Sequence, residues 1–599
     1  MAVRLVANSK RSMGQNGVVK VAFFSMEIAF DPLIPTYSGG LGVLAGDMLR
    51  SAADLEVPMA GVTLAYRKGY FKQKLDFNGD QTEEPDVWVP EECEDLKEMT
   101  PRATVEIEGR QVQVRAWRAA VKGLSGYEVP VYLLDTNLPG NSKEDQALTD
   151  SLYGGGEHYR LRQEVVLGMG GIGILRALGH TGIESYHMNE GHSAFLTLAL
   201  LEQRLGRPEL GFASPDDVEA VRRQCVFTTH TPVPAGHDLF PKSMVVEVLG
   251  PARALGVDIS HCCPEGTLNM TYLALHLSHY VNGVAMRHGE VSHTLFPNYP
   301  IRAITNGVHA ATWTSPALQG LYDRYIPEWR RDNLYLRYAI GISLAEIRQA
   351  HEEAKRALFQ EVRKATGESL DPKFLTVGFA RRAATYKRAD LLFAKPERLE
   401  WITQQVGPLQ VIYAGKAHPN DADGKAMIRR VFKAASGLQD SVRVVYIPDY
   451  NMRWAQLLTA GVDVWLNTPR RPYEASGTSG MKAALNGVPS LSVLDGWWIE
   501  GCVEGATGWA IGRDGSSTQD DYLAEVASLY DKLEMVILPM FYGRPHAFNE
   551  VMRHAIALNG SFFNTQRMLE QYVSNAYFPG REAMGRHKNE EGQNAPVAR

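Results

Sequence analysis

The sequence has little cysteine, with five residues in a chain of 599: Cys93, Cys225, Cys262, Cys263 and Cys502. Their number is odd, no CxxC pair occurs, and the adjacent pair at 262–263 has a poor spacing for zinc. These features argue against a disulfide framework and against a structural metal centre. We therefore expect reduced thiols in a cytoplasmic protein and predict no metal site.

Long apolar runs and an excess of basic charge are also lacking. No uninterrupted stretch of about 18 apolar residues occurs, so no membrane span is expected, and the first residues lack the apolar core of a signal peptide. Lys and Arg number 62 against 68 Asp and Glu, a net charge of −6. A general nucleic-acid binder would carry a basic face, so we expect no nucleic-acid partner. A local cationic pocket for phosphate is still allowed.

Short apolar runs separated by longer amphipathic stretches are the main feature of the sequence. Such alternation predicts an α/β architecture with parallel sheets. The predicted strands are Val19–Phe24, Val131–Leu134, Cys225–Thr228, Phe374–Ala380, Val411–Tyr413, Val442–Tyr446, Val462–Leu466 and Leu491–Leu494.

The strands fall into two series, which predicts two α/β halves. We place an N-terminal domain at residues 1–320 and a C-terminal domain at 321–579, with a disordered polar tail at 580–599. The clearest helix begins after Ser343, where Ser343 and Glu346 form an S-x-x-E capping box, and Gly367 ends it.

Gly168, Gly170 and Gly173 spell G-x-G-x-x-G, the pattern of a dinucleotide-binding turn. The preceding segment YRLRQE is charged and helix-like, and the helix that should follow is short. A glycine-rich helix that packs closely against a neighbour is the better interpretation.

The segment EASGTSGMK (474–482) follows a predicted strand and leads into a short helix. Thr478 or Ser479 suits the N-cap of that helix. Free backbone N–H groups and the positive end of a helix dipole favour a phosphate there. Lys482 in the first turn could pair with the anion or form a Schiff base with an aldehyde cofactor. The alternative is a solvated lysine on the helix surface with no functional role.

The segment RRAATYKR (381–388) follows another buried strand, at the carboxyl end where open α/β sheets bind ligands. Arg381, Arg382, Lys387 and Arg388 place four cations within eight residues. Two neighbouring phosphates would need such a cluster, because the anions repel each other. A solvated charge run is the alternative.

Weaker signals come from a glycine turn and two polar residues. Gly39 and Gly40 let the backbone approach an anion closely. His230 lies just past a strand and Asn306 lies in a turn, and either could bind sugar hydroxyls or be structural.

Taken together, these segments resemble the glycogen/α-glucan phosphorylase family, in order and over most of the chain. The similar segments are YSGGLGVLA (37–45), AYRKGYFKQKLD (65–76), TTHT (228–231), VNGVAMRHGEV (281–291), TNGVH (305–309), RRAATYKR, PDYNM (448–452) and EASGTSGMK. The last resembles the family's cofactor-lysine motif and RRAATYKR its phosphate motif. Both are highly specific.

The resemblance implies two Rossmann-like domains facing each other across a cleft, the glycosyltransferase-B arrangement. Pyridoxal 5'-phosphate is the implied cofactor, and α-1,4-glucan, inorganic phosphate and glucose 1-phosphate are the implied substrates and products. The implied catalytic residues are Lys482, Arg382, Lys387 and His230. The implied cofactor site is Lys482, Arg381, Tyr450, Thr478, Ser479 and Gly480. The implied substrate site is Gly39, Gly40, Leu41, His230, Asn306, Glu474, Ser476 and Gly477.

The implied reaction is retaining phosphorolysis. The substrate phosphate protonates the glycosidic oxygen, the cofactor phosphate serves as its proton reservoir, and the phosphate then attacks an oxocarbenium-like centre on the same face. Water must be kept out, because hydrolysis would compete.

Departures from the family pattern keep alternatives open. Ser479-Gly480 replaces Gly-Asn before Met-Lys, Arg381 replaces a lysine, and the chain begins almost at its first predicted strand. Regulation by nucleotide or phosphorylation and a homo-oligomer are therefore left open. A nucleotide-sugar glucan synthase of the same broad fold would have a lysine at Tyr37 and none at Lys482. A catalytically dead glucan-binding protein need not keep the phosphate cluster.

Overall fold

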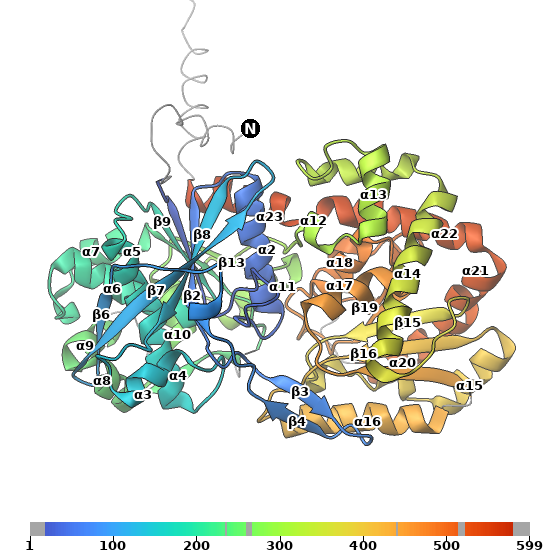
Figure 1. Cartoon of the computed structure of the whole chain (residues 1–599), viewed down its shortest axis with the longest axis horizontal. Coiled ribbons are helices and arrows are strands. Elements are labelled where there is room, and N and C mark those ends of the chain that lie inside the picture. Colours follow the sequence, from blue (N-terminus) through green and yellow to red (C-terminus); the bar gives the residue numbers. More distant parts are fainter. Residues whose placement is uncertain (1–17, 234–235, 259–265, 439–440, 513–520, 579–599) are drawn as a thin grey trace, which may run out of the picture.

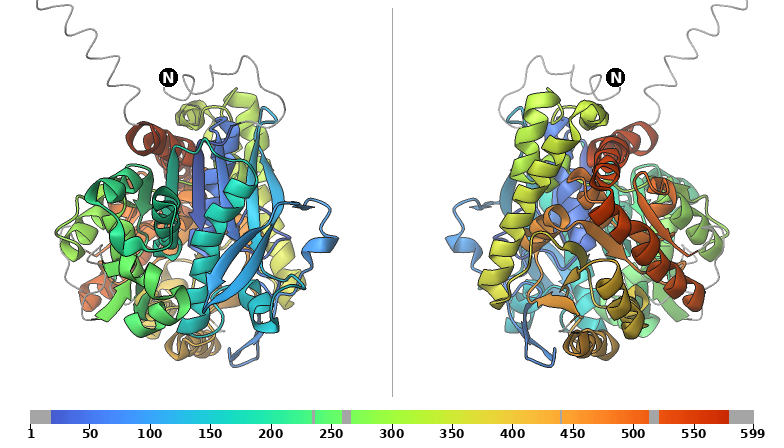
Figure 2. Two further views of the ribbon diagram at one scale, coloured as in Figure 1. Left: turned by 90° about the vertical axis from the view of Figure 1, so that its left-hand side faces the viewer. Right: turned by 90° about the vertical axis from the view of Figure 1, so that its right-hand side faces the viewer.

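The computed structural model of the chain describes residues 18–233, 236–258, 266–438, 441–512 and 521–578. The predictions for the first residues, for Cys262 and Cys263 and for the tail at 580–599 lie outside this part. Figure 1 shows two sheets side by side, each covered by helices. The predicted mixed α/β class with parallel sheets is confirmed, and Figure 2 shows the two halves end on.

The N-terminal sheet is parallel at its centre and antiparallel at one edge. Its strands follow the order β14-β13-β10-β9-β1-β2-β8-β7-β5, and β6 also pairs with β7. The parallel strands are β1 (Val21–Ser25), β2 (Met59–Leu64), β8 (Glu128–Asp135), β9 (Ser185–Asn189), β10 (Cys225–Thr228), β13 (Tyr280–Gly283) and β14 (Arg302–Ala303). The antiparallel edge is β5 (Lys97–Glu98), β6 (Ala103–Ile107) and β7 (Arg110–Lys122).

The C-terminal sheet is parallel throughout, in the order β17-β16-β15-β18-β19-β20. Its strands are β15 (Leu375–Ala380), β16 (Leu409–Ala414), β17 (Val442–Ile447), β18 (Val464–Asn467), β19 (Ser490–Val493) and β20 (Gly508–Ile511). Each predicted strand in either half overlaps an observed one. Strands of parallel sheets are buried on both faces and therefore form continuous apolar runs. This explains why these strands could be predicted from the sequence.

The predicted helix after Ser343 is α14 (Leu344–Thr366), and it is confirmed at both ends. The Ser343 hydroxyl accepts a hydrogen bond from the Glu346 amide at 3.3 Å. Gly367 ends the helix with φ +77°, a left-handed conformation that glycine adopts without strain. Other helices of the C-terminal half are α15 (Pro396–Gln405), α16 (Ala422–Leu438), α17 (Met452–Gly461), α18 (Ser479–Leu485), α20 (Tyr522–Lys532), α21 (Leu538–Gly543) and α22 (Pro545–His554).

The G-x-G-x-x-G segment lies inside a helix and not in a nucleotide-binding turn. Helix α4 (Glu157–Val165) continues through a π-helical turn (Val166–Gly170) into α5 (Gly171–Ala177). A Cβ atom on Gly168 would lie 2.6 Å from the Leu196 backbone nitrogen in α6 (Phe195–Leu205). The predicted close helix packing is confirmed.

The end of the described chain returns to the N-terminal sheet, which sequence analysis did not identify. Helix α23 (Thr565–Tyr572) and a π-helical turn (Val573–Tyr577) lie beside α2 (Gly40–Asp54), as Figure 1 shows. Their apolar side chains share a buried cluster with Val21 and Phe23 of β1. The Tyr577 hydroxyl lies 2.6 Å from Nδ1 of the buried His187 in β9. The C-terminal segment is therefore part of the N-terminal core.

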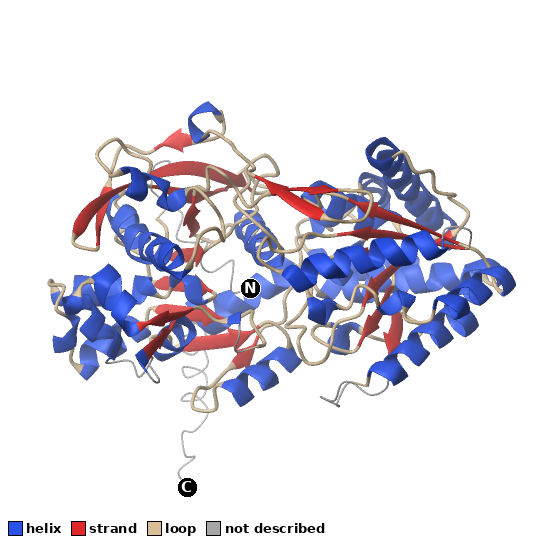
Figure 3. Cartoon of the chain, turned by 90° about the horizontal axis from the view of Figure 1, so that it is seen from below, coloured by secondary structure: helices blue, strands red, loops and turns tan. Residues whose placement is uncertain are grey.

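A β-hairpin joins the halves at the opposite side of the molecule. Strands β3 (Lys72–Leu75) and β4 (Gln81–Glu84) reach from the N-terminal half to α16 (Figures 1 and 3). The buried Gln73 amide donates to the Gly415 carbonyl at 2.9 Å. Gln81 donates to the Ala417 carbonyl at 2.8 Å and accepts from its amide at 2.9 Å. These bonds link the two halves through backbone groups.

Cys93, Cys225 and Cys502 are free thiols. Among the helices in the described ranges, none has both the length and the apolar character to cross a bilayer.

Candidate active site

The predicted cofactor and phosphate segments follow adjacent strands of the C-terminal sheet. From β15 the sheet grows outward through β16 and β17 on one side and through β18, β19 and β20 on the other. The loops after β15 and β18 therefore diverge at a topological switch point, where open α/β sheets bind ligands. The first loop contains Arg381 and Lys387, and the second leads through Glu474 to Lys482.

The N-terminal sheet has a similar switch point between β1 and β9. The glycine turn lies after β1 and begins α2, and Asn189 and Glu190 follow at the end of β9. Contacts bring this edge to the C-terminal half: the Met452 amide donates to the Tyr37 hydroxyl at 3.2 Å. Asp47 of α2 accepts from Trp313 Nε1 at 2.6 Å. The Trp313 ring in turn lies 4.0 Å from Lys482 Nζ.

Lys482 is buried and does not behave as a solvated surface lysine. It is 6% exposed, and its main described contact is the Trp313 ring, a cation–π arrangement. Burial lowers the pKa of its amine to about 8, with Asp47 raising the pKa and Arg50 lowering it further. The lowered pKa makes the neutral, nucleophilic amine accessible near neutral pH.

The turn before Lys482 leaves polar groups facing inward. Thr478 is the N-cap of α18, as predicted, although its side chain makes no capping bond. Ser479 Oγ accepts from Trp465 Nε1 at 3.0 Å. A Cβ atom on Gly480 would lie 2.7 Å from the Trp497 ring, so the ring leaves little room for a side chain there. The buried Ser476 hydroxyl has no hydrogen-bond partner within the described part of the chain, which fits a group that binds a ligand.

Arg381 and Lys387 converge on one carboxylate oxygen. Glu474 Oε2 lies 2.5 Å from Arg381 Nη2 and 2.7 Å from Lys387 Nζ. Burial favours the neutral acid, but Arg381 and Lys387 outweigh it and hold the pKa of Glu474 at about 2. Nε and Nη1 of Arg381 are buried, and the residues that the structure describes offer them no acceptor. The cluster is therefore an anion-binding centre with donors to spare, and Glu474 now supplies its negative charge.

The other two arginines of RRAATYKR lie elsewhere. Arg382 is exposed. Arg388 is buried and turns toward the sheet, where it donates to the Thr468 and Pro469 carbonyls at 2.9 and 2.7 Å and pairs with Glu525 at 2.5 Å. Arg388 thus ties the loop after β15 to the segment after β18 and to α20. The four-cation cluster that the sequence suggests is centred on Arg381 and Lys387.

The glycine turn is held by a buried acid that sequence analysis missed. Glu27 accepts from the Ser38 amide at 2.6 Å and from the Gly39 amide at 3.1 Å. Tyr153 donates to its other oxygen at 2.9 Å. A Cβ atom on Gly39 or Gly40 would meet nothing within 4 Å, so open space adjoins the turn. Leu41, the next residue, is half-buried.

His230 lies at the end of β10 and is neutral. Its Nε2 lies 2.7 Å from Asn189 Oδ1, and its amide donates to Glu190 at 2.7 Å. Burial, with smaller effects from His288 and two further histidines, lowers its pKa to about 3. Asn189 Oδ1 can only accept, so Nε2 bears the proton and Nδ1 is an acceptor.

Glu190 was also missed. It is buried with φ +75°, a strained conformation that often marks functional sites, and burial raises its pKa to about 7. The signal in the sequence was the polar segment MNEGHS directly after a buried strand.

Asn306 and Tyr450 complete the predicted set. Asn306 Oδ1 is buried and accepts no hydrogen bond from the described residues. Arg567 of α23 donates to the Thr305 and Asn306 carbonyls at 2.7 and 2.9 Å. Tyr450 is half-buried near Tyr37 and Arg381, and burial raises its pKa. The predicted assignments of these residues to cofactor and substrate stay predictions.

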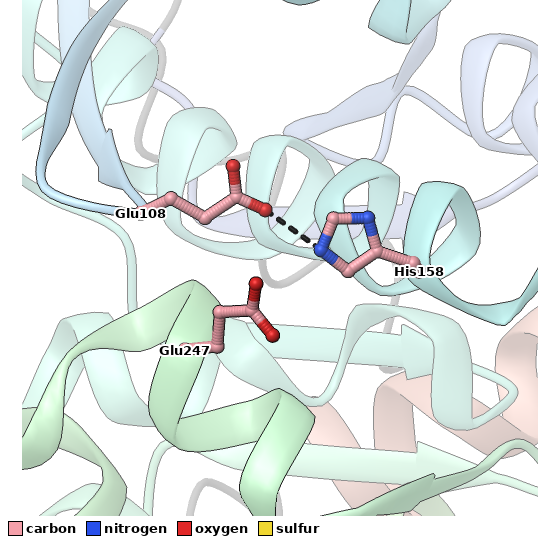
Figure 4. Close-up of side chains that lie close together, drawn as sticks. All are labelled: Glu108, His158 and Glu247. Atoms are coloured by element: carbon pink, nitrogen blue, oxygen red, sulfur yellow. Dashed lines mark ion pairs between the residues drawn. The ribbon is translucent and has the colours of Figure 1, made fainter.

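A separate group in the N-terminal half resembles a metal site but is explained by other contacts. Glu108, His158 and Glu247 bring their ligand atoms within 4.8 Å of one another (Figure 4). Glu108 lies 2.7 Å from His158 and accepts from Arg110 at 2.8 Å. The contacts tie the β6–β7 turn to α4, and Glu247 is exposed.

The fold and the site define an α/β protein with a buried lysine and a cation cluster at the carboxyl edge of a parallel sheet, beside a second, mixed sheet. The model of the carbohydrate phosphorylase family matches residues 36–150 and 253–504. A maltodextrin phosphorylase of Thermococcus litoralis is 38% identical over 93% of this chain and 70% of that protein. Glycogen phosphorylases of Mycobacterium tuberculosis and Aquifex aeolicus are 36% and 35% identical, over 94% and 93% of this chain and 71% and 86% of theirs. The chain belongs to the carbohydrate phosphorylase family.

Proposed function

We propose that the chain is an α-1,4-glucan phosphorylase, a hexosyltransferase that converts terminal glucosyl units and inorganic phosphate into α-D-glucose 1-phosphate. The observation that supports this most is the buried Lys482 at the same sheet edge as the Arg381–Lys387 anion centre. The relatives named above act, by their names, on glycogen or maltodextrin, and we extend those substrates to this chain.

The residues present fit pyridoxal 5'-phosphate. The Lys482 amine lies over the Trp313 ring and has a lowered pKa. The Arg381 donors and the Ser476 hydroxyl that lack a partner among the described residues suit a phosphate. We assign the cofactor to Lys482, Arg381, Tyr450, Thr478, Ser479 and Gly480. When bound, its phosphate supplies a second anion that exchanges a proton with the substrate phosphate.

The chain's own residues hold the anions and the sugar. Lys387 and Arg382, with the glycine turn at Gly39–Gly40, bind the substrate phosphate once Glu474 releases its hold on the cations. Glu474 then accepts from glucosyl hydroxyls, together with Ser476, Gly477, Asn306 and the neutral His230. Neighbouring cations keep the two phosphates close despite their repulsion. The oxocarbenium-like centre is thereby placed next to its nucleophile.

The finer arrangement belongs to the same proposal. We propose that residues 1–320 and 321–579 form two Rossmann-like domains that face each other across a cleft, with α23 crossing back to the first. We also propose that the protein is cytoplasmic and that it self-associates, since both properties are compatible with a phosphorylase.

The test is incubation with maltodextrin and inorganic phosphate, with and without added pyridoxal 5'-phosphate, scored for glucose 1-phosphate. We expect release that depends on phosphate and is lost in Lys482→Ala. A matched change, Lys433→Ala on the exposed face of α16, should leave release intact. Glucan extension from a nucleotide sugar without phosphate dependence would instead favour a synthase.

A further inference from the structure

A cavity lies near the edge of the C-terminal sheet that is formed by the amino ends of its strands, opposite the edge of the proposed active site. It measures about 570 Å³, and its walls come from α14, α21, α22 and the loop before β15. Phe374 and Asp463 precede β15 and β18, so the cavity adjoins the amino ends of the strands whose carboxyl ends lead to Arg381 and Glu474.

Positive charge dominates the lining. Arg348, Lys355, Arg356 and Lys373 line the cavity with a single carboxylate, Glu352. Arg348 pairs with Glu352 at 2.9 Å and lies 3.8 Å from the buried Asp463, which also pairs with Lys355. Arg356 and Lys373 are exposed, and neither forms an ion pair among the described residues. In a chain of net charge −6, this local excess favours an anionic ligand.

A buried ammonium at the cavity has a donor to spare. Lys355 has a side chain 1% exposed and donates to Asp463 Oδ2 at 2.6 Å and to the Phe374 carbonyl at 2.7 Å. An ammonium has three N–H donors, and the third has no acceptor among the described residues. Since Lys355 lines the cavity, that donor can serve a ligand there.

The opposite wall is aromatic. Phe541, Tyr542 and Phe548 line the cavity, and the Phe541 ring lies 5.4 Å from the Arg348 guanidinium and 5.7 Å from Lys355 Nζ. A flat ring can stack on these side chains while its charged group reaches the cations. We propose that this cavity is a binding site for an aryl phosphate, meaning a phosphate ester attached to a flat ring system. The proposal does not depend on the proposed catalytic function.

Hydrogen–deuterium exchange of the whole protein with phenyl phosphate tests the site. We expect saturable protection of segments 345–356 and 538–549. Inorganic phosphate should need at least a tenfold higher concentration to protect these segments, and phenol should give no protection. Protection at 381–388 reports any binding at the proposed active site separately.

Charge reversal in Arg356→Glu/Lys373→Glu should weaken phenyl phosphate binding at the cavity at least tenfold. The control Arg363→Glu/Lys433→Glu has the same net change at two exposed positions outside the cavity and should bind as the unaltered protein does. The proposal would be overturned if the cavity variant were protected by phenyl phosphate as strongly as the unaltered protein. It would also be overturned if phenol protected these segments as well as phenyl phosphate does, or if millimolar phenyl phosphate gave no protection.

Discussion

Lys482 shows how burial, as the main cause, prepares a side chain for chemistry. A buried ammonium loses its hydration, which favours the neutral amine, and the pKa of Lys482 falls to about 8 against the usual 10.5. The Trp313 ring offsets only part of the lost solvation. The position is therefore costly for a structural lysine and suited to a nucleophile.

We expect covalent uptake of pyridoxal 5'-phosphate by the apoprotein to speed up as pH rises, with the midpoint of the increase near pH 8. The neutral amine attacks the aldehyde, and at pH 6 it makes up only about 1% of a lysine with that pKa. Mass spectrometry after borohydride reduction, at timed intervals from pH 6 to pH 10, measures the label on Lys482. Lys482→Arg should take up none, and a midpoint near 10.5 would contradict the assignment.

Glu474 pairs with the two cations to which we assign a phosphate in the proposed function. Its Oε2 receives both Arg381 and Lys387, which stabilises the cations while they lack another anion. In the proposed function, a phosphate that enters the site displaces this carboxylate, and the displaced side chain then accepts from sugar hydroxyls.

We expect Glu474→Gln to bind inorganic phosphate more tightly, by roughly tenfold to a hundredfold, since a hydrogen bond to a charged group contributes about 1.5–3 kcal/mol. Turnover of glucan should fall in the same variant, because the proposed sugar contact is weakened. Calorimetry measures the first effect. Glu504→Gln, which removes a partly exposed pair with Lys532, serves as control and should change neither quantity. Unchanged or weaker phosphate binding would show that the carboxylate does not compete.

At the scale of elements, α23 supports a loop of the proposed sugar site. Arg567 is surrounded by carbonyl acceptors, and burial lowers its pKa to about 10. Its bonds to the Thr305 and Asn306 carbonyls fix the backbone of the turn, so the unpartnered Asn306 amide oxygen is held in one place. Arg567 is thus a positioning residue.

We expect Arg567→Met to raise KM for maltodextrin about tenfold, in line with loss of a hydrogen bond made by a charged group. The KM for phosphate and the cofactor content should stay unchanged. Arg567→Lys can still donate to one carbonyl and should recover part of the loss. An equal rise in both KM values, or no recovery with lysine, would indicate general destabilisation.

How far the sequence predicts these elements depends on whether their signal is local. Strands β10 and β15 and the ends of α14 were predicted because burial and capping leave patterns within a few residues. Glu27, Asp47 and Arg567 were missed, since their partners are distant in sequence or are backbone groups, which no motif records. Thr478 was one of two residues predicted for the N-cap of α18, and it holds that position without a capping bond from its side chain. The pairing of Glu474 with Arg381 spans 93 residues and left no local pattern.

At the scale of the whole molecule, two segments connect the N-terminal and C-terminal halves, one on each side of the molecule. The β3–β4 hairpin joins the N-terminal half to the C-terminal half, and α23 with the following turn completes the N-terminal core. The second contact is apolar and large. The buried side chains that it adds are Met568, Leu569, Tyr572, Val573, Ala576, Tyr577 and Phe578.

Removal of residues 565–599 should therefore prevent cooperative folding of the N-terminal half. Burial of one large apolar side chain contributes about 1.5–3 kcal/mol, so the lost contacts rival the total stability of a typical domain, about 5–15 kcal/mol. Thermal unfolding followed by circular dichroism measures the effect against a chain that ends at residue 578, which should keep the native Tm. Leu569→Ala gives a graded version, with an expected loss of about 2–5 kcal/mol. A chain ending at residue 564 that melts within a few degrees of the longer one would show that the N-terminal sheet is stable without this segment.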